Sequence, residues 1–181
     1  MALNVLFVCT GNICRSPMAE RIMQARLAPG SGVVVTSAGT HALVGHGIDA
    51  NAARVTREFG ADPDDHQGRL ATEQILGASD LVLTATERHR DDLLRLVPRA
   101  MRRTFTMREF VRLGRHLSAP GSGDLVARVA EVAAQRGQVP PAGPGEDDIG
   151  DPYGAAFELM QACGAAVSSS VDGTLGILGL S

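Results

Sequence analysis

Residues 3–17 read LNVLFVCTGNICRSP, and this stretch determines the fold. Its first part, Leu3–Val8, is an apolar run with β-branched and aromatic residues, which is typical of a buried strand. Its last two residues favour the start of a helix, because Ser16 can cap a helix N-terminus and Pro17 suits the first helical position. The stretch therefore predicts a strand, a loop from Cys9 to Arg15 and a helix in direct succession.

The alternation of strand and helix continues along the chain. Apolar runs predict further strands at Gly32–Gly39, Leu81–Thr84 and Arg103–Thr106. Apolar residues at helical spacing predict helices from Ser16 to the stop signal Pro29-Gly30, at 49–59, 86–96 and 125–133, and from near Ala155. This pattern is typical of an α/β fold, and we expect a doubly wound, four-stranded parallel sheet with helices on both faces. Ligands of such sheets bind beyond the carboxyl ends of the strands, where Cys9 lies.

The composition indicates one soluble globular domain over residues 1–181. Apolar residues make up 44% and charged residues 20% of the chain, which excludes a chain that is disordered throughout. A net charge of -3, with one Tyr and no Trp, argues against a nucleic-acid partner. Residues 137–145 hold six Gly or Pro in nine positions and predict a mobile surface loop inserted into the domain.

No segment predicts a membrane span or secretion. The longest apolar run near the N-terminus, Val5–Cys9, is far shorter than the ~20 residues that cross a bilayer, and no Lys or Arg precedes it. The three cysteines are an odd number and do not suggest a disulfide framework. These features favour a cytoplasmic protein with free thiols and no membrane insertion.

The loop from Cys9 to Arg15 has the properties of an oxyanion site. A glycine-containing loop at a helix N-terminus gathers backbone N–H groups around one point, where the helix adds about half a positive charge. Arg15 can offer two parallel donors to phosphate, and Gly11 and Asn12 tolerate the positive φ of a tight anion nest. The same groups stabilise a thiolate, which makes Cys9 a candidate nucleophile. The competing interpretation is a buried packing cysteine and a surface arginine.

Two motifs resemble those of the low-molecular-weight protein tyrosine phosphatases. Residues 8–20, VCTGNICRSPMAE, are similar to the family's signature, and Asp151-Pro152-Tyr153-Gly154 resembles its general-acid loop. Ser37-Ala38-Gly39-Thr40 and the stretch 80–94 are similar to its second-strand and third-strand regions. The resemblance covers most of the chain. It implies a Cys9 nucleophile that forms a cysteinyl-phosphate, with Asp151 as general acid and with no metal or other cofactor.

The resemblance also implies roles for neighbouring residues. The phosphate would be held by Arg15 and by the loop residues, which are Thr10, Gly11, Asn12, Ile13, Cys14 and Ser16. Asn12 and Ser37 resemble a family pair whose hydrogen bond locks the loop. The hydroxyl of Ser16 is expected to donate to the thiolate, alongside or instead of capping the helix. Tyr153 is expected to line the mouth and pack on an aromatic substrate, and its alternative role is ordinary packing.

Three positions depart from the family pattern. Thr86 stands where the family commonly has an Asp that supports the active-site region. The stretch from about Leu113 to Gly145 is longer than in typical members, and the site-wall loop at His41–His46 lacks an aromatic residue. The first departure bears on the support of the site, and the other two bear on substrate preference rather than on the chemistry.

The other cysteines and the histidines carry separate expectations. Cys14 lies on the same small loop as Cys9, and a disulfide between them would protect an oxidised Cys9 if their Cα atoms lie within ~7 Å. The alternative for Cys14 is a buried packing thiol, and Cys163 is expected to pack in the last helix. The five histidines lack paired ligand spacing, so we expect no metal site.

The function that these features favour is hydrolysis of phosphotyrosine in protein substrates, with inorganic phosphate as product. Arsenate reductase chemistry is disfavoured, because it passes oxidation along two further cysteines and only Cys163 lies beyond the loop. A phosphoarginine phosphatase on the same scaffold stays an alternative, although its loop commonly has a Thr where this chain has Ile13. A non-catalytic, phosphate-binding pseudophosphatase is the alternative from another class, and the joint presence of Cys9, Arg15 and Asp151 argues against it.

Overall fold

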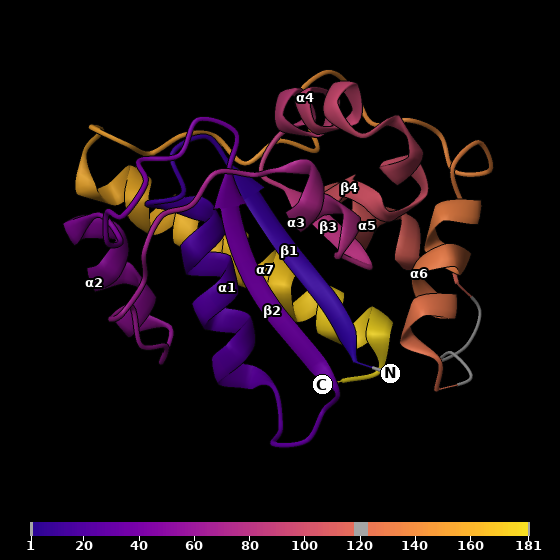
Figure 1. The fold of residues 1–181 in the computed structure, drawn as a ribbon, viewed down its shortest axis with the longest axis horizontal. Helices are drawn as coiled ribbons and strands as arrows, with labels where there is room; N and C mark the ends of the chain where they lie inside the picture. Colours follow the sequence, from indigo (N-terminus) through magenta and orange to yellow (C-terminus); the bar gives the residue numbers. More distant parts are fainter. Residues whose placement is uncertain (1, 118–122, 181) are drawn as a thin grey trace.

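The computed structural model describes residues 2–117 and 123–180. Its centre is a four-stranded parallel sheet in the order β2-β1-β3-β4 (Figure 1). The strands are β1 (Leu3–Cys9), β2 (Val33–Gly39), β3 (Leu81–Thr84) and β4 (Thr104–Thr106). The predicted parallel α/β sheet is confirmed, and β1, in the middle of the sheet, carries Cys9 to its carboxyl edge.

Successive side chains of β1 face opposite sides of the sheet, and each side is covered by helices. Val5 and Phe7 belong to the larger of two apolar clusters, whereas Leu6 and Val8 belong to the smaller one. The larger cluster is closed by α1 (Arg15–Arg26), α5 (Met107–Gly114) and α7 (Phe157–Leu178). The smaller cluster is closed by α3 (Glu73–Gly77), α4 (Glu87–Leu96) and the 3-10 helix η1 (Pro98–Arg103). The helices therefore cover both faces, as expected.

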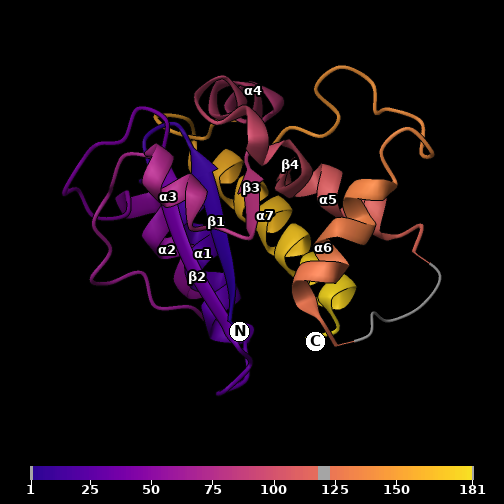
Figure 2. The ribbon, with the colours of Figure 1, turned by 45° about the vertical axis from the view of Figure 1, so that its right-hand side comes forward.

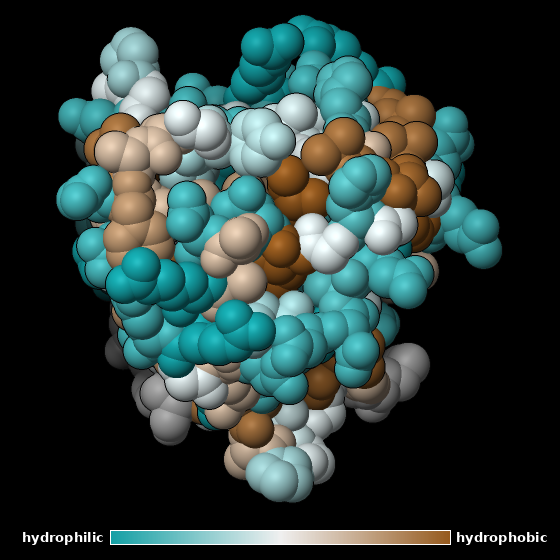
Figure 3. All heavy atoms as spheres, turned by 90° about the vertical axis from the view of Figure 1, so that its left-hand side faces the viewer, coloured by the Kyte–Doolittle hydropathy of each residue, from teal (hydrophilic) through white to brown (hydrophobic). Residues whose placement is uncertain are grey.

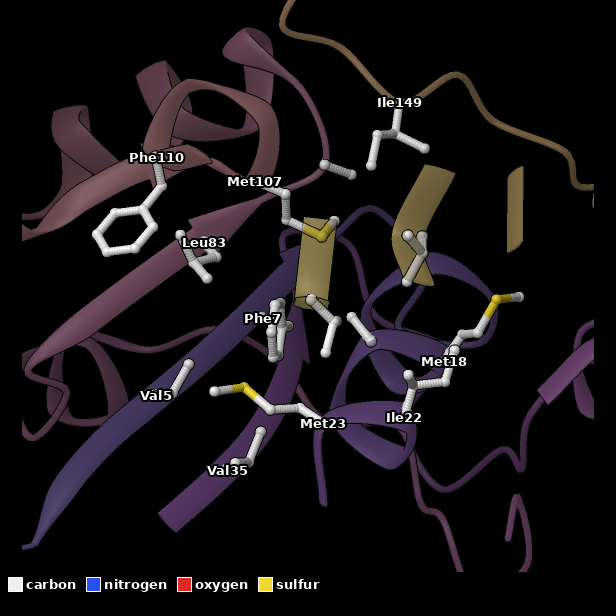
Figure 4. Packing of buried hydrophobic residues seen from close by; sticks show 14 of the residues in the cluster. Val5, Phe7, Met18, Ile22, Met23, Val35, Leu83, Met107, Phe110 and Ile149 are labelled. Carbon is white, nitrogen blue, oxygen red and sulfur yellow. The ribbon is translucent and has the colours of Figure 1, made fainter. Parts of the chain in front are cut away.

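The larger cluster is the main core of the molecule. Met18, Ile22 and Met23 of α1 are fully buried against Phe7 of β1 (Figure 4). The long helix α7 crosses this side of the sheet (Figure 2). Two further helices, α2 (Ala50–Glu58) and α6 (Leu125–Ala134), add side chains to its margin. The start of α1, and with it the loop after β1, is thus anchored in the best-packed part of the structure.

The helices α3, η1 and α5 lie outside the predicted pattern. α5 begins directly at the end of β4, where Thr106 and Glu109 form a reciprocal capping box. This start signal overlaps the stretch Arg103–Thr106, in which the sequence predicts only a strand. The last helix begins at Phe157 rather than near Ala155, because the backbone of Ala156 is extended, with ψ at 151°.

The segment between α6 and α7 runs over the carboxyl ends of the strands (Figure 1). Ile149 fixes it there, because this side chain is buried and its amide donates to the carbonyl of Ala85 at 2.8 Å, directly after β3. The Gly/Pro-rich stretch 137–145 precedes this anchor and lies at the surface, where Arg136 and Val139 form an isolated bridge. The segment 146–156 is thereby placed above the loop after β1.

The surface is predominantly polar. The face in Figure 3 carries mostly hydrophilic residues, with smaller apolar patches between them. Large apolar side chains that remain exposed include Val44, Leu159 and Tyr153. Within residues 2–117 and 123–180, no helix combines the length and the hydropathy that a bilayer span requires.

The loop after β1 packs directly against Gly39 at the end of β2. A Cβ atom at Gly39 would collide with the carbonyl oxygen of Thr10 and would lie 3.0 Å from the amide nitrogen of Asn12. Both neighbours are backbone atoms, which cannot turn away as the end of a side chain can. The close approach of the loop therefore requires a glycine at this position.

We expect Gly39→Ala to lower the free energy of unfolding by about 1–3 kcal/mol, because the added methyl group overpacks the loop. Gly176→Ala is a matched control in α7, where a Cβ atom meets nothing within 4 Å. Its higher helix propensity should raise the free energy of unfolding by about 0.5–1 kcal/mol. Urea denaturation followed by circular dichroism measures both changes, and an unchanged stability of Gly39→Ala would contradict the close packing.

Candidate active site

The carbonyl groups of residues 9–14 are all held by partners outside the loop. The amides of the segment 40–49 supply four of these bonds: Thr40 to Cys9 (2.9 Å), His41 to Thr10 (3.0 Å), Leu43 to Gly11 (2.9 Å) and Asp49 to Ile13 (2.8 Å). His66 Nε2 donates to the carbonyl of Asn12 at 2.7 Å. The amide of Met18 donates to the carbonyl of Cys14 at 3.1 Å. These bonds turn the carbonyl oxygens away from the centre of the loop.

The amides of the same loop are left for an anion. Over the residues that the structure describes, no amide of residues 10–15 donates a hydrogen bond to a protein acceptor. The peptide groups that turn their oxygens outward turn these N–H groups inward, and α1 begins at Arg15 with its positive dipole end at the same place. The loop is therefore arranged as a cup of donors.

Cys9 lies beside Ser16 at the base of this cup. Both side chains are buried, and Cys9 Sγ lies 3.0 Å from Ser16 Oγ. Ser16 Oγ accepts a hydrogen bond from Asn12 Nδ2 at 3.0 Å, so its own hydrogen is available to an acceptor. The sulfur is the nearer acceptor, because the carbonyl of Ala38 is 3.3 Å away. This arrangement places a hydroxyl donor against the sulfur of Cys9.

Asn12 ties the loop to the rest of the domain. Its φ of 55° is one of two positive values at residues other than glycine in the described part of the chain. Its Nδ2 donates to Ser37 Oγ at 2.9 Å, and its Oδ1 accepts from the amide of Arg69 at 2.9 Å. Ser37 Oγ in turn donates to the carboxylate of Glu20 on α1. The strained residue is thus held by β2, by α1 and by the segment before α3.

Arg15 connects the cup to the segment between α6 and α7. Its side chain is buried, at 3% exposure, and its two terminal nitrogens are engaged with that segment. One donates to the carbonyl of Ile149 at 3.0 Å, and the other forms an ion pair with Asp151 Oδ2 at 2.9 Å. Arg15 Nε is buried and has no partner among the described residues. The guanidinium therefore has one N–H group that is free to donate to an anion. An incoming anion can also replace the Asp151 carboxylate as its partner.

Several contacts hold Asp151 at the rim of the cup. Asp148 Oδ1 accepts from the amide of Glu87 at the start of α4 at 2.7 Å, and Arg108 donates to the carbonyl of Asp148 at 2.8 Å. The Asp151 carboxylate also accepts from the amide of Tyr153 at 3.2 Å and is 52% exposed. The backbone on the amino side of Asp151 is thus fixed, whereas its carboxylate reaches both Arg15 and solvent.

A cavity of about 210 Å³ opens over the cup. It is lined by Cys9, Thr10, Gly11, Ile13, Cys14, Arg15, His41, Leu43, Asp151 and Tyr153. Its floor is polar, whereas Ile13, Leu43 and Tyr153 make its wall and mouth largely apolar. Tyr153 is 61% exposed and stands at the opening. Of the predicted site residues, Asn12, Ser16 and Ser37 lie outside the lining and act through the hydrogen bonds described above.

Thr86 supports the site through a histidine. Its Oγ1 caps α4 by accepting from the amide of His89 at 3.3 Å, and it lies 2.8 Å from His89 Nδ1. His89 Nε2 lies 2.8 Å from Thr10 Oγ1 in the loop. Burial lowers the pKa of His89 to about 4, and the Arg15 guanidinium acts in the same direction, so this imidazole is neutral at pH 7.

The remaining thiols differ from Cys9 in their surroundings. All three cysteines are free, so the predicted disulfide between Cys9 and Cys14 stays a prediction. Burial raises the pKa of Cys14 far above its usual value, and the negative charges of Asp49 and Cys9 act in the same direction. Burial likewise raises the pKa of Cys163 to about 11. Both are protonated at neutral pH and are not candidate nucleophiles.

Metal ligands do not gather at this site. Among residues 2–117 and 123–180, no three or more His, Cys, Asp or Glu side chains are placed to hold a metal ion. The positive charge that faces the cavity comes from Arg15, the loop amides and the start of α1. These protein groups can stabilise the charge of an oxyanion in the cavity.

Sequence analysis missed three supports of the loop. His66 and Arg69 act from before α3, and His89 acts from α4. The partner of each in the loop lies more than fifty positions away in the chain. His89 carried one usable signal, because it stands three residues after the helix cap Thr86, and this spacing places the two side chains together.

The comparison with protein families matches residues 4–135 to the model described as low molecular weight phosphotyrosine protein phosphatase. The chain is 41% identical over 101 residues to the low molecular weight protein-tyrosine-phosphatase Etp of Escherichia coli K12. That match covers 56% of this chain and 66% of Etp, just under two thirds of its length. A protein-arginine-phosphatase of Geobacillus stearothermophilus is 31% identical over 172 residues, which cover 95% of this chain and 93% of that protein.

Solved structures of phosphatases are similar to this protein over nearly the whole chain. The YwlE arginine phosphatase from Geobacillus stearothermophilus superposes with a TM-score of 0.74 at 29% identity, covering 98% of this chain and 93% of that one. A low molecular weight protein tyrosine phosphatase from T. tengcongensis superposes with a TM-score of 0.71 at 30% identity. The match covers 97% of this chain and 99% of that one. The match to the family model spans well over half of the chain, so this protein belongs to the low molecular weight phosphotyrosine protein phosphatase family.

Proposed function

We propose that the protein hydrolyses phosphotyrosine in protein substrates through a cysteinyl-phosphate. The observation that carries this proposal is a single cavity that brings together Cys9, Arg15 and Asp151, above a cup of unpaired amides. Family membership supports it, because relatives are named as protein-tyrosine-phosphatases. No metal or other cofactor takes part in the proposed steps.

In the first step the Cys9 thiolate attacks phosphorus in line. The S–P bond forms as the P–O bond to the tyrosine oxygen breaks, and Asp151 transfers its proton to that oxygen. The loop amides and Arg15 donate to the non-bridging phosphoryl oxygens, whose charge they stabilise without having to reorganise. Residues 10–14 and 16 serve as the phosphate loop in this proposal, and Ser37 serves as its support.

In the second step water attacks the cysteinyl-phosphate. Asp151, now a carboxylate, takes a proton from the water, the O–P bond forms and the S–P bond breaks. Inorganic phosphate is the product, and the released thiolate is again stabilised by the hydroxyl of Ser16. The distance of 3.0 Å between these two atoms suits this role.

The ion pair between Arg15 and Asp151 is broken when substrate binds. A phosphate dianion competes with the carboxylate for the guanidinium, because it carries two negative charges against one and also offers an acceptor to the unpaired Nε. Asp151 then loses its cationic partner and gains a negative neighbour, and both changes favour its protonated form. In this proposal the substrate itself generates the acid that the first step requires.

The walls of the cavity favour an aryl phosphate over phosphoarginine. Ile13, Leu43 and Tyr153 offer apolar surface to a phenyl ring. A guanidinium leaving group would have Asp151 as the only carboxylate in the lining. Phosphoarginine stays the second candidate, because the matched protein-arginine-phosphatase covers nearly the whole chain. A non-catalytic phosphate-binding protein is the third.

We further propose that residues 1–181 form one phosphatase domain that works in the cytoplasm. Both apolar clusters pack on the same sheet, and the segment that carries Asp151 returns to it after the Gly/Pro-rich insertion at 137–145. Three free thiols agree with a reducing compartment.

We expect the pure protein to release phosphate from phosphotyrosine peptides faster than from phosphoarginine or phosphoserine peptides. EDTA should leave the rate unchanged. Phosphate release from matched peptides measures kcat/KM for each class. A preference for phosphoarginine would select the second candidate, and the absence of turnover on every class would select the third.

Cys9→Ser should reduce turnover by at least about 10³-fold, because the hydroxyl is a far weaker nucleophile than the thiolate. It should still bind inorganic phosphate, because the amides and Arg15 remain. Cys163→Ala is the matched control, and we expect it to keep wild-type turnover. Steady-state kinetics and isothermal titration calorimetry with phosphate provide the two readouts, and substantial turnover in Cys9→Ser would remove Cys9 from the nucleophilic role.

Asp151→Asn should slow phenyl phosphate by about 10²–10⁴-fold and p-nitrophenyl phosphate by much less, because only the poorer leaving group depends on a proton donor. Glu158→Gln at the start of α7 is the control for the loss of a nearby negative charge, and it should leave both rates unchanged. Single-turnover kinetics isolate the first step. An equal loss on both substrates would show that Asp151 is not the general acid.

A further inference from the structure

His89 joins the phosphate loop to the start of α4. It is 5% exposed, and each ring nitrogen has a threonine hydroxyl as its partner. Nδ1 lies 2.8 Å from Thr86 Oγ1, and Nε2 lies 2.8 Å from Thr10 Oγ1. The proposed chemical steps do not use this residue, yet Thr10 lines the cavity next to Cys9.

The contacts of Thr86 favour one of the two neutral tautomers of His89. Thr86 Oγ1 already accepts from the amide of His89 as the cap of α4, so its hydroxyl hydrogen is free to donate. The acceptor within reach is His89 Nδ1. A neutral imidazole has one donor and one acceptor, so Nε2 then carries the hydrogen and donates to Thr10 Oγ1. Burial keeps the ring neutral, with its pKa lowered to about 4.

The same sequence of bonds sets the role of the Thr10 hydroxyl. Its oxygen accepts from His89, so its hydrogen is not used in this contact. If the imidazole had the opposite tautomer, Thr10 would donate to Nε2 and would have no hydrogen left for the cavity. The tautomer of His89 therefore determines whether the Thr10 hydroxyl is available as a donor beside Cys9.

We propose that His89 is a positioning residue which, held by Thr86, orients the Thr10 hydroxyl as a donor to a phosphoryl oxygen bound in the loop. This inference rests on the proposed phosphatase function for its kinetic consequence, but not for its binding consequence. The inference also gives Thr86 a role in the site. Thr86 acts on the loop through the uncharged hydrogen bonds from its hydroxyl to His89 and from His89 to Thr10.

The test combines isosteric and conservative variants. Thr10→Val removes the hydroxyl at nearly constant shape, and His89→Leu removes the ring donor. Each should lower both kcat/KM and the affinity for inorganic phosphate by about tenfold, the effect of one hydrogen bond to a charged group. Thr10→Ser and His89→Gln keep the donors, so they should retain most of the kcat/KM and most of the affinity for inorganic phosphate. His116→Gln, at an exposed histidine, is the control and should change neither.

A double-mutant cycle separates positioning from general support. If His89 acts through the Thr10 hydroxyl, Thr10→Val with His89→Leu should be no worse than the more damaging single change. Losses that multiply would overturn the inference. Should His89→Leu fail to fold, as judged by circular dichroism, Thr10→Val and His89→Gln still provide the test, because an unchanged phosphate affinity in Thr10→Val overturns it.

The tautomer supplies a readout that does not depend on activity. Long-range ¹H–¹⁵N correlation spectra of the wild-type protein at pH 7 should show His89 with its hydrogen on Nε2. A hydrogen on Nδ1 would overturn the inference. Absence of turnover in the wild type would reject the proposed function alone, because the spectra and the phosphate titrations would still decide the role of His89.

Discussion

The orientation of six consecutive carbonyl groups is the constraint on which the site depends. The oxygens of residues 9–14 are all bound from outside the loop, chiefly by the amides of residues 40–49. A peptide group that is fixed at its oxygen is also fixed at its N–H, so the donors converge before any anion arrives. The donors are already ordered, so an anion that binds in this cup does not lose free energy to their reorganisation. Such preorganised donors give strong electrostatic stabilisation. Gly39 permits this geometry, because only a glycine lets β2 approach the loop so closely.

The sequence predicted those parts of the molecule whose signals are local. The strand, loop and helix in residues 3–17 follow from an apolar run, a glycine and a helix start, and the parallel sheet follows from the repetition of that pattern. The predicted cap was wrong, because α1 begins at Arg15 and Ser16 lies inside it. The placement of Asp151 beside Arg15 has no such signal, because the two residues are far apart in the chain, and only the resemblance to a family implied it. His89 was missed for the same physical reason, because its contact with Thr10 spans 79 positions. α5 was missed because its capping box overlaps a strand of three residues.

The Gly/Pro-rich stretch before the segment that carries Asp151 is anchored at both ends. Arg136, before the Gly/Pro-rich stretch, pairs with the buried Glu109 and lies over the ring of Phe105 at 4.2 Å. Asp147, after it, pairs with Arg112 of α5 at 2.7 Å. The residues between these two ion pairs can therefore vary in number without moving Ile149. The geometry around Asp151 therefore does not depend on the length of this stretch.

The helix α7 follows closely on Asp151 and also completes the main core. Its Val167 and Val171 are fully buried, in the same cluster as Phe7 and Met18. Undocking this helix would expose the core and would also release one end of the segment that carries the carboxylate. The packing of the core and the position of the backbone that follows Asp151 therefore depend on the same helix.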